Sequence, residues 1–226
     1  MGAFVEKNFL FLMLGVASVF VAVWLSLFRN RMRYQWLAVI VITLLSMVLG
    51  VASVKLFAFL ECFGEAYNGS ISLFGAVFFM PFAFAVGAKV THRPVRDVFD
   101  VLTIPLVFTL ILTRVNCLRA GCCYGIPIHG TGLRYPTREA EIVFYLGFLL
   151  IEAPKVYKNE TFGEVYPLYM MSYGIFRAVV ECFRHSASAD GLFHVSHVWA
   201  ILSFGIGASI YIELKRQRKI RSTRKR

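Results

Sequence analysis

Long apolar blocks separated by short polar connections dominate the sequence. Seven blocks approach or reach the ~20 residues with which a helix crosses a bilayer, and they cover residues 8–28, 36–60, 71–90, 98–116, 139–153, 166–184 and 194–214. We therefore predict an all-α, polytopic integral membrane protein with seven transmembrane helices. A chain of 226 residues requires no second domain, so we expect a single transmembrane domain over residues 1–226.

The basic residues between these blocks predict an orientation. They gather in alternate connections, which must face the same side of the membrane: Arg29, Arg31 and Arg33 in the first, Lys89, Arg93 and Arg96 in the third, Lys155 and Lys158 in the fifth, and eight more in the tail 215–226. Short loops rich in Lys and Arg usually face the cytoplasm. We expect the N-terminus outside and the C-terminus inside, with residues 215–226 as a basic cytoplasmic tail.

Composition agrees with a membrane location. Hydrophobic residues make up 58% of the chain and charged residues 16%, against roughly 45–50% and about 25% in soluble domains. The net charge of +11 does not indicate a nucleic-acid partner, because eight of the 24 basic residues lie in the last twelve positions. A basic run directly after a membrane helix is typical of contact with anionic membrane lipid.

Charged residues inside the apolar blocks are the first candidates for function, because charges within a membrane are costly. The segment "YGIFRAVVECFR" places Tyr173, Arg177, Glu181 and Arg184 at spacings of four, four and three, which puts them on one face of a helix. We interpret this face as anion-binding, with Glu181 holding Arg177 against a phosphate. A structural ion pair that locks helix packing remains the alternative.

The segment "TRVNCLRAGCCYG" combines a charged residue with three thiols. Arg114 ends an apolar block, and two glycines follow. The cysteine spacing matches no common zinc pattern, and adjacent cysteines form only a strained disulfide ring. We therefore expect the loop to be the rim of a phosphate-binding site, where serine replacements at Cys122 and Cys123 reduce activity modestly. A thiol-redox or metal-handling protein built on Cys117, Cys122 and Cys123 is the rival interpretation.

The segment "RYPTREAEIVFY" predicts the start of a helix. Thr137 is expected as its N-cap and Glu139 as an acid of its first turn, whereas Glu141 is expected to turn inward toward an arginine. Asp100 has a similar first-turn explanation in the block before Arg114. His185, His194 and His197, near the outer boundary, are expected to be packing or hydrogen-bonded residues, with a role as ligand or catalytic base as the alternative. Cys62 and Cys182 are expected to be buried small residues.

Three motifs in order resemble the prolipoprotein diacylglyceryl transferase family: "R-x-x-C-x-x-x-G-C-C-Y-G", "R-Y-P-T-x-x-x-E" and "Y-G-x-x-R-x-x-x-E-x-x-R". The resemblance covers about residues 70–205. It implies a seven-helix, multi-pass enzyme of the bacterial cytoplasmic (inner) membrane. Such an enzyme moves a diacylglyceryl group from phosphatidylglycerol to the lipobox cysteine of a prolipoprotein, recognised with its signal peptide, and uses no cofactor.

The resemblance also implies roles for particular residues. The expected catalytic residues are Arg114, Glu141, Tyr173, Arg177 and Glu181, and the expected substrate-binding residues are Asp100, Cys117, Gly121, Cys122, Gly125, Arg134 and Arg184, with no metal ligand among them. The chain departs from the family where Cys117 replaces an asparagine, Cys122 a glutamate and Phe74 a histidine important for activity. These departures leave three alternatives: a transferase with a different base, a relative that uses another acceptor, and an inactive homologue.

Overall fold

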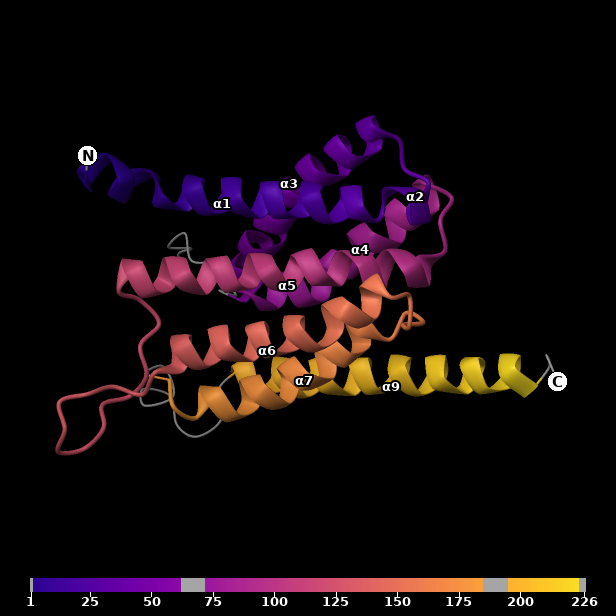
Figure 1. The fold of residues 1–226 in the computed structure, drawn as a ribbon. Helices are drawn as coiled ribbons and strands as arrows, with labels where there is room; N and C mark the ends of the chain where they lie inside the picture. The colour runs from indigo at the N-terminus through magenta and orange to yellow at the C-terminus, as the bar shows by residue number, and fades with distance from the viewer. Residues whose placement is uncertain (1, 62–71, 185–194, 224–226) are drawn as a thin grey trace. The chain divides into compact units, whose positions relative to one another are not determined.

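The computed structural model describes residues 2–61, 72–184 and 195–223. Within these ranges the chain forms helices and no strand; Gly125 bridges Arg184, and Pro127 bridges Arg134, as two isolated β-bridges. Figure 1 shows the helices α1 (Gly2–Leu27), α2 (Arg29–Met32), α3 (Trp36–Glu61), α4 (Phe74–Val90), α5 (Val95–Ala120), α6 (Thr137–Tyr157), α7 (Val165–Glu181) and α9 (Val195–Thr223).

The all-helical class is confirmed, and each predicted apolar block overlaps one long helix. In the part of the chain that the structure describes, three helices are long and apolar enough to cross a membrane: α3, α5 and α9 as far as Ile220. Phe11–Leu27 and Phe74–Val90 are shorter apolar helices. The remaining two predicted spans are α6, which carries two buried glutamates, and α7, which has 17 residues. Seven spans and their orientation therefore stay predictions.

Exposed apolar surface marks two of these helices. Only 17% of the apolar stretch of α3 and 22% of that of α9 is buried by the rest of the chain, against 61% for α5. The exposed side of α3 includes Trp36, Leu37, Ile40, Leu44 and Val48. A soluble protein rarely exposes apolar patches of this extent, so these faces match contact with lipid.

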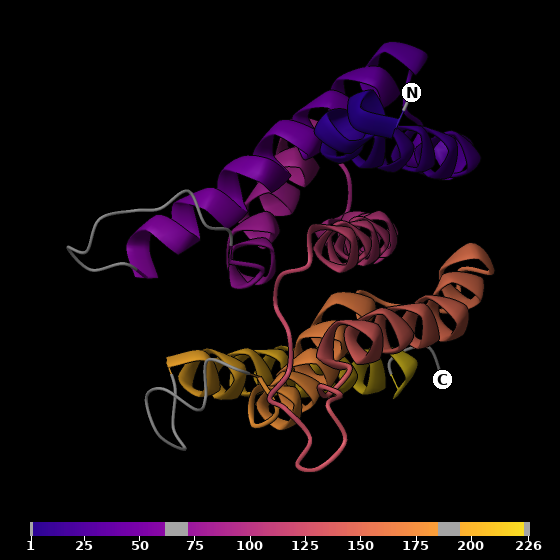
Figure 2. The ribbon, with the colours of Figure 1, turned by 90° about the vertical axis from the view of Figure 1, so that its left-hand side faces the viewer.

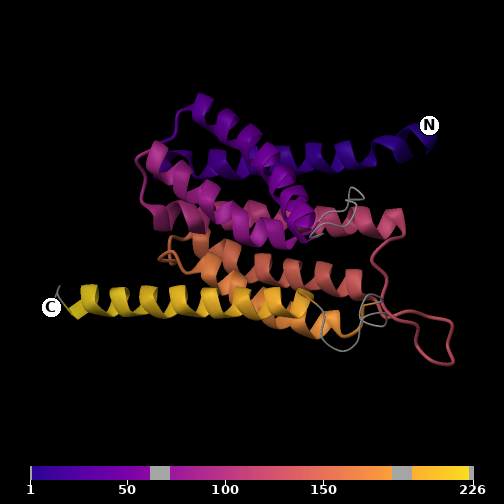
Figure 3. The same cartoon turned by 180° about the vertical axis from the view of Figure 1, so that it is seen from behind.

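The chain divides into two compact units, residues 1–110 and residues 111–226. In the first unit α3 packs against α1 and α4 (Figure 3). A Cβ on Gly75 would collide with the backbone of Ser53, so this glycine allows α4 to approach α3 closely. The Trp24 indole N–H of α1 donates to the Val101 carbonyl of α5 at 2.9 Å. The expectation of a single domain stays a prediction.

In the second unit α7 and α9 lie side by side (Figure 2). Gly174 of α7 and Gly207 of α9 each face the backbone of the opposite helix so closely that a Cβ would collide with it. Ser203 of α9 is fully buried and donates to the Met170 carbonyl at 3.0 Å. Small residues and interhelical hydrogen bonds are the usual means by which helices associate in lipid.

Two helix ends differ from the prediction. Helix α5 continues four residues beyond residue 116 and stops at Gly121, whose φ of 62° is the left-handed conformation that ends many helices. The predicted tail is helical as far as Thr223, because α9 continues through it. There Lys215 and Arg218 contact the carboxylate of Glu164, at 3.4 and 3.1 Å.

Candidate active site

Five charged side chains, from α5, α6, α7 and the turn that follows α7, form one continuous chain of ion pairs. Arg114 of α5 donates from Nε to Oε2 of Glu141 on α6 at 2.5 Å, and Arg177 of α7 donates to the other oxygen, Oε1, at 3.0 Å. Arg177 also contacts Oε2 of Glu181 at 2.8 Å, and Arg184 lies 3.6 Å from the same oxygen. Glu141 therefore bridges Arg114 and Arg177, and Glu181 bridges Arg177 and Arg184.

This ion-pair chain is buried and has a surplus of positive charge. The side chains of Arg114, Glu141, Arg177 and Glu181 are 2–6% exposed, and that of Arg184 is 18% exposed. Three guanidinium groups and two carboxylates give a formal charge of 3 − 2 = +1. A buried positive charge needs a counter-charge, and guanidinium groups match phosphate oxygens in pairs. The arrangement therefore favours an anionic ligand.

Local helix geometry explains most of this arrangement. Spacings of four and three residues place Arg177, Glu181 and Arg184 along one side of α7 and its C-terminal turn. Glu141 lies on the buried face of α6, as predicted, whereas Glu139 is exposed in the first turn. The structural alternative is also visible here, since the same pairs hold α5, α6 and α7 together.

Buried tyrosines continue the polar interior beside the ion pairs. Tyr173 lies within electrostatic range of Arg114 and Arg177, and its ring stacks near those of Tyr145 and Tyr169, with centroids 6.3 and 5.7 Å apart. All three rings are at most 1% exposed. Among the described residues the Tyr145 hydroxyl has no hydrogen-bond partner.

Tyr145 was not predicted as a site residue. The signal available in the sequence was its position four residues after Glu141, which places both side chains on the same face of α6. Its buried, unpartnered hydroxyl is suited to donate a hydrogen bond to a ligand oxygen, because a buried hydroxyl without a partner is costly.

The loop between α5 and α6 is bonded to the elements around it. The Ile126 N–H donates to the Phe183 carbonyl at 2.8 Å, and the Tyr135 N–H donates to the Ile126 carbonyl at 3.1 Å. A Cβ on Gly125 would collide with the backbone of Tyr135 and approach that of Phe183. Gly125 is therefore required for the loop to pass this closely beside the end of α7.

Thr137 has a different role from the predicted one. The N-cap of α6 is Pro136, and Thr137 is the first helical residue. Its hydroxyl donates to the Cys123 carbonyl at 3.2 Å and not to the helix N-terminus. The prediction of a Thr137 N-cap is thus wrong, because the hydroxyl finds a carbonyl acceptor in the cysteine loop.

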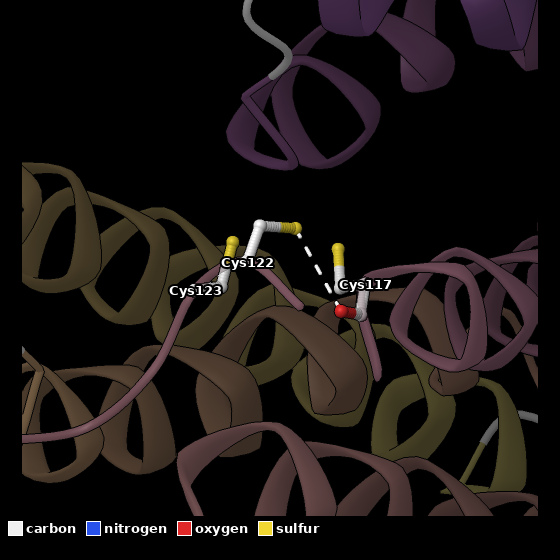
Figure 4. Close-up of side chains that lie close together, drawn as sticks. All are labelled: Cys117, Cys122 and Cys123. Atoms are coloured by element: carbon white, nitrogen blue, oxygen red, sulfur yellow. Dashed lines mark hydrogen bonds between the residues drawn. The ribbon is translucent and has the colours of Figure 1, made fainter. Parts of the chain in front are cut away.

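Three thiols meet at this loop (Figure 4). The Sγ atoms of Cys117, Cys122 and Cys123 all lie within 4.8 Å of one another. Cys122 donates through its backbone N–H to the Cys117 carbonyl at 3.2 Å, and its Sγ lies 3.8 Å from the same oxygen. A hydrogen bond with Cys117 and the positive charges of Arg114 and Arg184 lower the pKa of Cys123 to about 5.

The remaining predicted site residues lie elsewhere. Arg134 is exposed on the loop, with its guanidinium 5.3 Å from the Tyr124 ring centroid. Asp100 is fully buried in α5 within the first unit. The acid in the first turn of α5 is Asp97, so the first-turn explanation of Asp100 is wrong, since the helix begins at Val95.

Phe74 belongs to an aromatic cluster of the first unit. Its side chain is 3% exposed, and its ring lies 6.3 Å from Phe57 and 6.2 Å from Phe78, measured between centroids. An apolar ring at this position is explained by packing. No group able to accept a proton stands there in this chain.

The histidines and the two other cysteines are only partly described. His185, His194 and Cys62 lie outside the described residues. His197 is 8% exposed, and its Nε2 lies 3.7 Å from the Cys182 sulfur. Cys182 is exposed and not buried as predicted, because it follows the last residue of α7.

Comparison with known proteins decides the family. The sequence profile described as prolipoprotein diacylglyceryl transferase matches residues 10–213. The chain belongs to this family. Two similar proteins, from two strains of Dehalococcoides mccartyi, are each named phosphatidylglycerol–prolipoprotein diacylglyceryl transferase, and each is 25% identical over 174 residues. The match covers 69% of this chain and 66% of the length of each relative.

The family membership confirms the resemblance found in the sequence motifs and indicates a transferase that works in a bacterial membrane. The three apolar, membrane-length helices agree with that location. The three sequence motifs supply the buried residues of the ion-pair chain: Arg114 comes from the first motif, Glu141 from the second, and Arg177 and Glu181 from the third. The structure thus brings together residues that lie up to 67 positions apart (181 − 114).

Proposed function

We propose that this protein transfers a diacylglyceryl group from phosphatidylglycerol to the lipobox cysteine thiol of a prolipoprotein and releases glycerol phosphate. The observation that carries this proposal is the buried ion-pair chain, whose surplus positive charge suits an anionic lipid phosphate. The family profile and the names of the two relatives support the same reaction class. Membrane lipid and the prolipoprotein signal peptide are the proposed partners.

In this reaction the acceptor sulfur attacks the glyceryl carbon that carries the phosphate oxygen. The carbon–sulfur bond forms as the carbon–oxygen bond breaks, and the electron pair of that bond stays on the phosphate of the leaving glycerol phosphate. Arg114 and Arg177 are the proposed phosphate ligands, because guanidinium donors placed in advance stabilise developing negative charge. Arg184 is the proposed third contact, since it is the most exposed of the three.

The two carboxylates are positioning residues in this mechanism. Glu141 holds one guanidinium with each of its oxygens, and Glu181 holds Arg177 from the opposite side. A fixed guanidinium needs no reorganisation when charge develops on the leaving oxygen. Tyr173 and Tyr145 are proposed to donate hydrogen bonds to the same phosphate.

The proposed topology places this reaction at the outer leaflet. Seven spans, with the N-terminus outside, put the cysteine loop and Asp190 outside and Lys158 inside. Single cysteines introduced at positions 158 and 190 test this with a membrane-impermeant thiol reagent. We expect labelling of position 190 from outside and of position 158 only after the membrane is opened; the reverse pattern contradicts the topology.

A transfer assay with phosphatidylglycerol and a lipobox peptide tests the reaction itself. We expect Arg177→Ala to lower the rate by about 10²–10³-fold, as expected for the loss of a preorganised donor to a developing anion. Arg218→Ala is the matched control, because that arginine is 51% exposed and contacts Glu164 at the far end of α7. Equal rates for the two variants contradict the proposal, as does failure of the wild-type gene to complement a strain depleted of its own transferase.

A further inference from the structure

The three thiols of Cys117, Cys122 and Cys123 are closer in space than their sequence spacing indicated. Their sulfur atoms lie within 4.8 Å of one another, and Figure 4 shows all three on the same side of the loop. Three thiolates on one tetrahedral zinc ion, with Zn–S bonds of about 2.3 Å, are about 3.8 Å apart. Side-chain rotations that move each sulfur by about 1 Å or less therefore suffice to complete this geometry.

The backbone around the thiols is already held in place. The Arg138 guanidinium donates to the carbonyls of Cys117 and Cys122 at 3.4 and 3.3 Å, and the Thr137 hydroxyl donates to that of Cys123. Cys123 itself adopts a left-handed φ of 59°, which is uncommon for a residue with a side chain. Such outer contacts are what orients the ligands of a metal site.

Within residues 2–61, 72–184 and 195–223 the thiol cluster offers three ligands. Among the described residues, no His, Asp, Glu or further Cys joins the group. Structural zinc sites normally have four protein ligands, whereas catalytic zinc sites have three and keep a position for the substrate. A zinc ion with three thiolates has a formal charge of −1. Arg138, which also lies over the Tyr124 ring and 3.5 Å from exposed Glu139, adds positive charge beside it.

We propose that Cys117, Cys122 and Cys123 bind one zinc ion, whose fourth position takes the thiol of the acceptor. This inference rests on the proposed transfer reaction and adds a cofactor to it. When the acceptor thiol binds zinc, its proton is released to water and the sulfur remains as a zinc-bound thiolate. That sulfur then forms the bond to the glyceryl carbon, the carbon–oxygen bond breaks, and its electron pair leaves with the phosphate.

The place of the thiol cluster supports this role. Cys117 follows Arg114 by three residues, so both lie on the same side of α5. Arg184, at the other end of the ion-pair chain, forms a β-bridge with Gly125, two residues after Cys123.

Metal analysis of the purified, detergent-solubilised protein tests the site directly. We expect about one zinc per chain, and one Cd²⁺ per chain on titration, seen by the ultraviolet sulfur-to-cadmium absorption. Cys117→Ser, Cys122→Ser and Cys123→Ser should each lower the affinity by at least 10²-fold. Cys182→Ser is the matched control, because this exposed cysteine lies outside the cluster, and it should bind like the wild type. Wild-type protein that binds neither metal with intact, reduced thiols overturns the inference.

A transfer assay shows whether the transfer reaction depends on zinc binding. Chelation should abolish transfer, and added Zn²⁺ should restore it. Arg177→Ala should bind zinc normally while losing transfer, so zinc binding without transfer in the wild type contradicts the proposed function but not the metal site. A Cys122→Ser/Cys123→Ser variant that transfers at nearly the wild-type rate would mean that these thiols only border the phosphate-binding site. That result overturns the inference.

Discussion

The two compact units differ in what they bury. In residues 1–110 the interior is mainly apolar, and the Phe78 ring stacks with the rings of buried Phe57 and Phe74. In residues 111–226 the interior contains linked charges and stacked tyrosines. Beside them lie three neighbouring thiols, of which Cys117 is buried, Cys123 is half-buried and Cys122 is exposed. Both units expose large apolar surfaces, so the difference lies in their interiors and not in their outer faces.

This difference indicates that the two units have different roles, ligand binding in residues 111–226 and stability of the fold in residues 1–110. Burying paired charges contributes little to stability compared with burying apolar groups of the same volume. An interior with a surplus charge is therefore more easily explained by ligand binding than by stability. The aromatic interior of the first unit needs no such explanation, because stacked rings stabilise the fold on their own.

Removing the central carboxylate should produce the largest effect. Glu141→Ala leaves Arg114 and Arg177 buried without their shared counter-charge, and breaking a buried pair costs about 3–5 kcal/mol. We expect a clear fall in the unfolding temperature in detergent and loss of transfer. Glu139→Ala, the exposed neighbour in the same helix turn, is the control. Equal unfolding temperatures for the two variants would show that the ion-pair chain is not buried as described.

Replacing the guanidinium group of Arg114 by another cation should have the second-largest effect. Arg114→Lys keeps a cation beside Glu141 but loses the planar pair of donors. We expect a fall of about 10²-fold in the transfer rate with a smaller change in unfolding temperature. A lysine variant as active as wild type would assign Arg114 to helix packing and would favour the structural alternative.

Replacing Phe74 by histidine tests whether the unit of residues 1–110 serves only as an apolar scaffold. Phe74→His places a polar ring among Phe57 and Phe78, where an unpaired buried polar group costs about 1–3 kcal/mol. We expect a lower unfolding temperature and no gain in transfer rate. An increase in rate would show that this position serves the reaction directly, and that the first unit is more than an apolar scaffold.

The surface ion pairs at the other end of α7 should matter least. Glu164→Gln removes the partner of Lys215 and Arg218, whose side chains are 48% and 51% exposed. Exposed pairs contribute about 0–1 kcal/mol. We expect a shift in unfolding temperature that is close to the error of the measurement at high salt. A large shift would mean that the C-terminal part of α9 is more strongly anchored than its exposure indicates.

The helices and the arginine–glutamate face of α7 could be predicted because both follow from local periodicity. Which charged residues of different helices pair with one another could not be predicted in this way. Glu141 was expected to face an arginine, but its two guanidinium partners come from α5 and α7, and helix packing alone decides that. The thiol cluster was missed for a similar reason: metal patterns count residues along the chain, whereas the left-handed Cys123 brings sulfurs together in space.

The ion-pair chain also affects how the protein is inserted into the membrane during its synthesis at the ribosome. Glu141 is made 27 residues after Arg114, and Arg177 another 36 residues later. Each charge alone costs about 2.5–3.5 kcal/mol at the centre of a membrane helix. Under the proposed topology, α5, α6 and α7 cannot settle into lipid one at a time. They should enter the lipid together, so in a truncated nascent chain that ends before Arg177 helices α5 and α6 should still cross-link to the insertion machinery, although α3 already anchors that chain in the membrane.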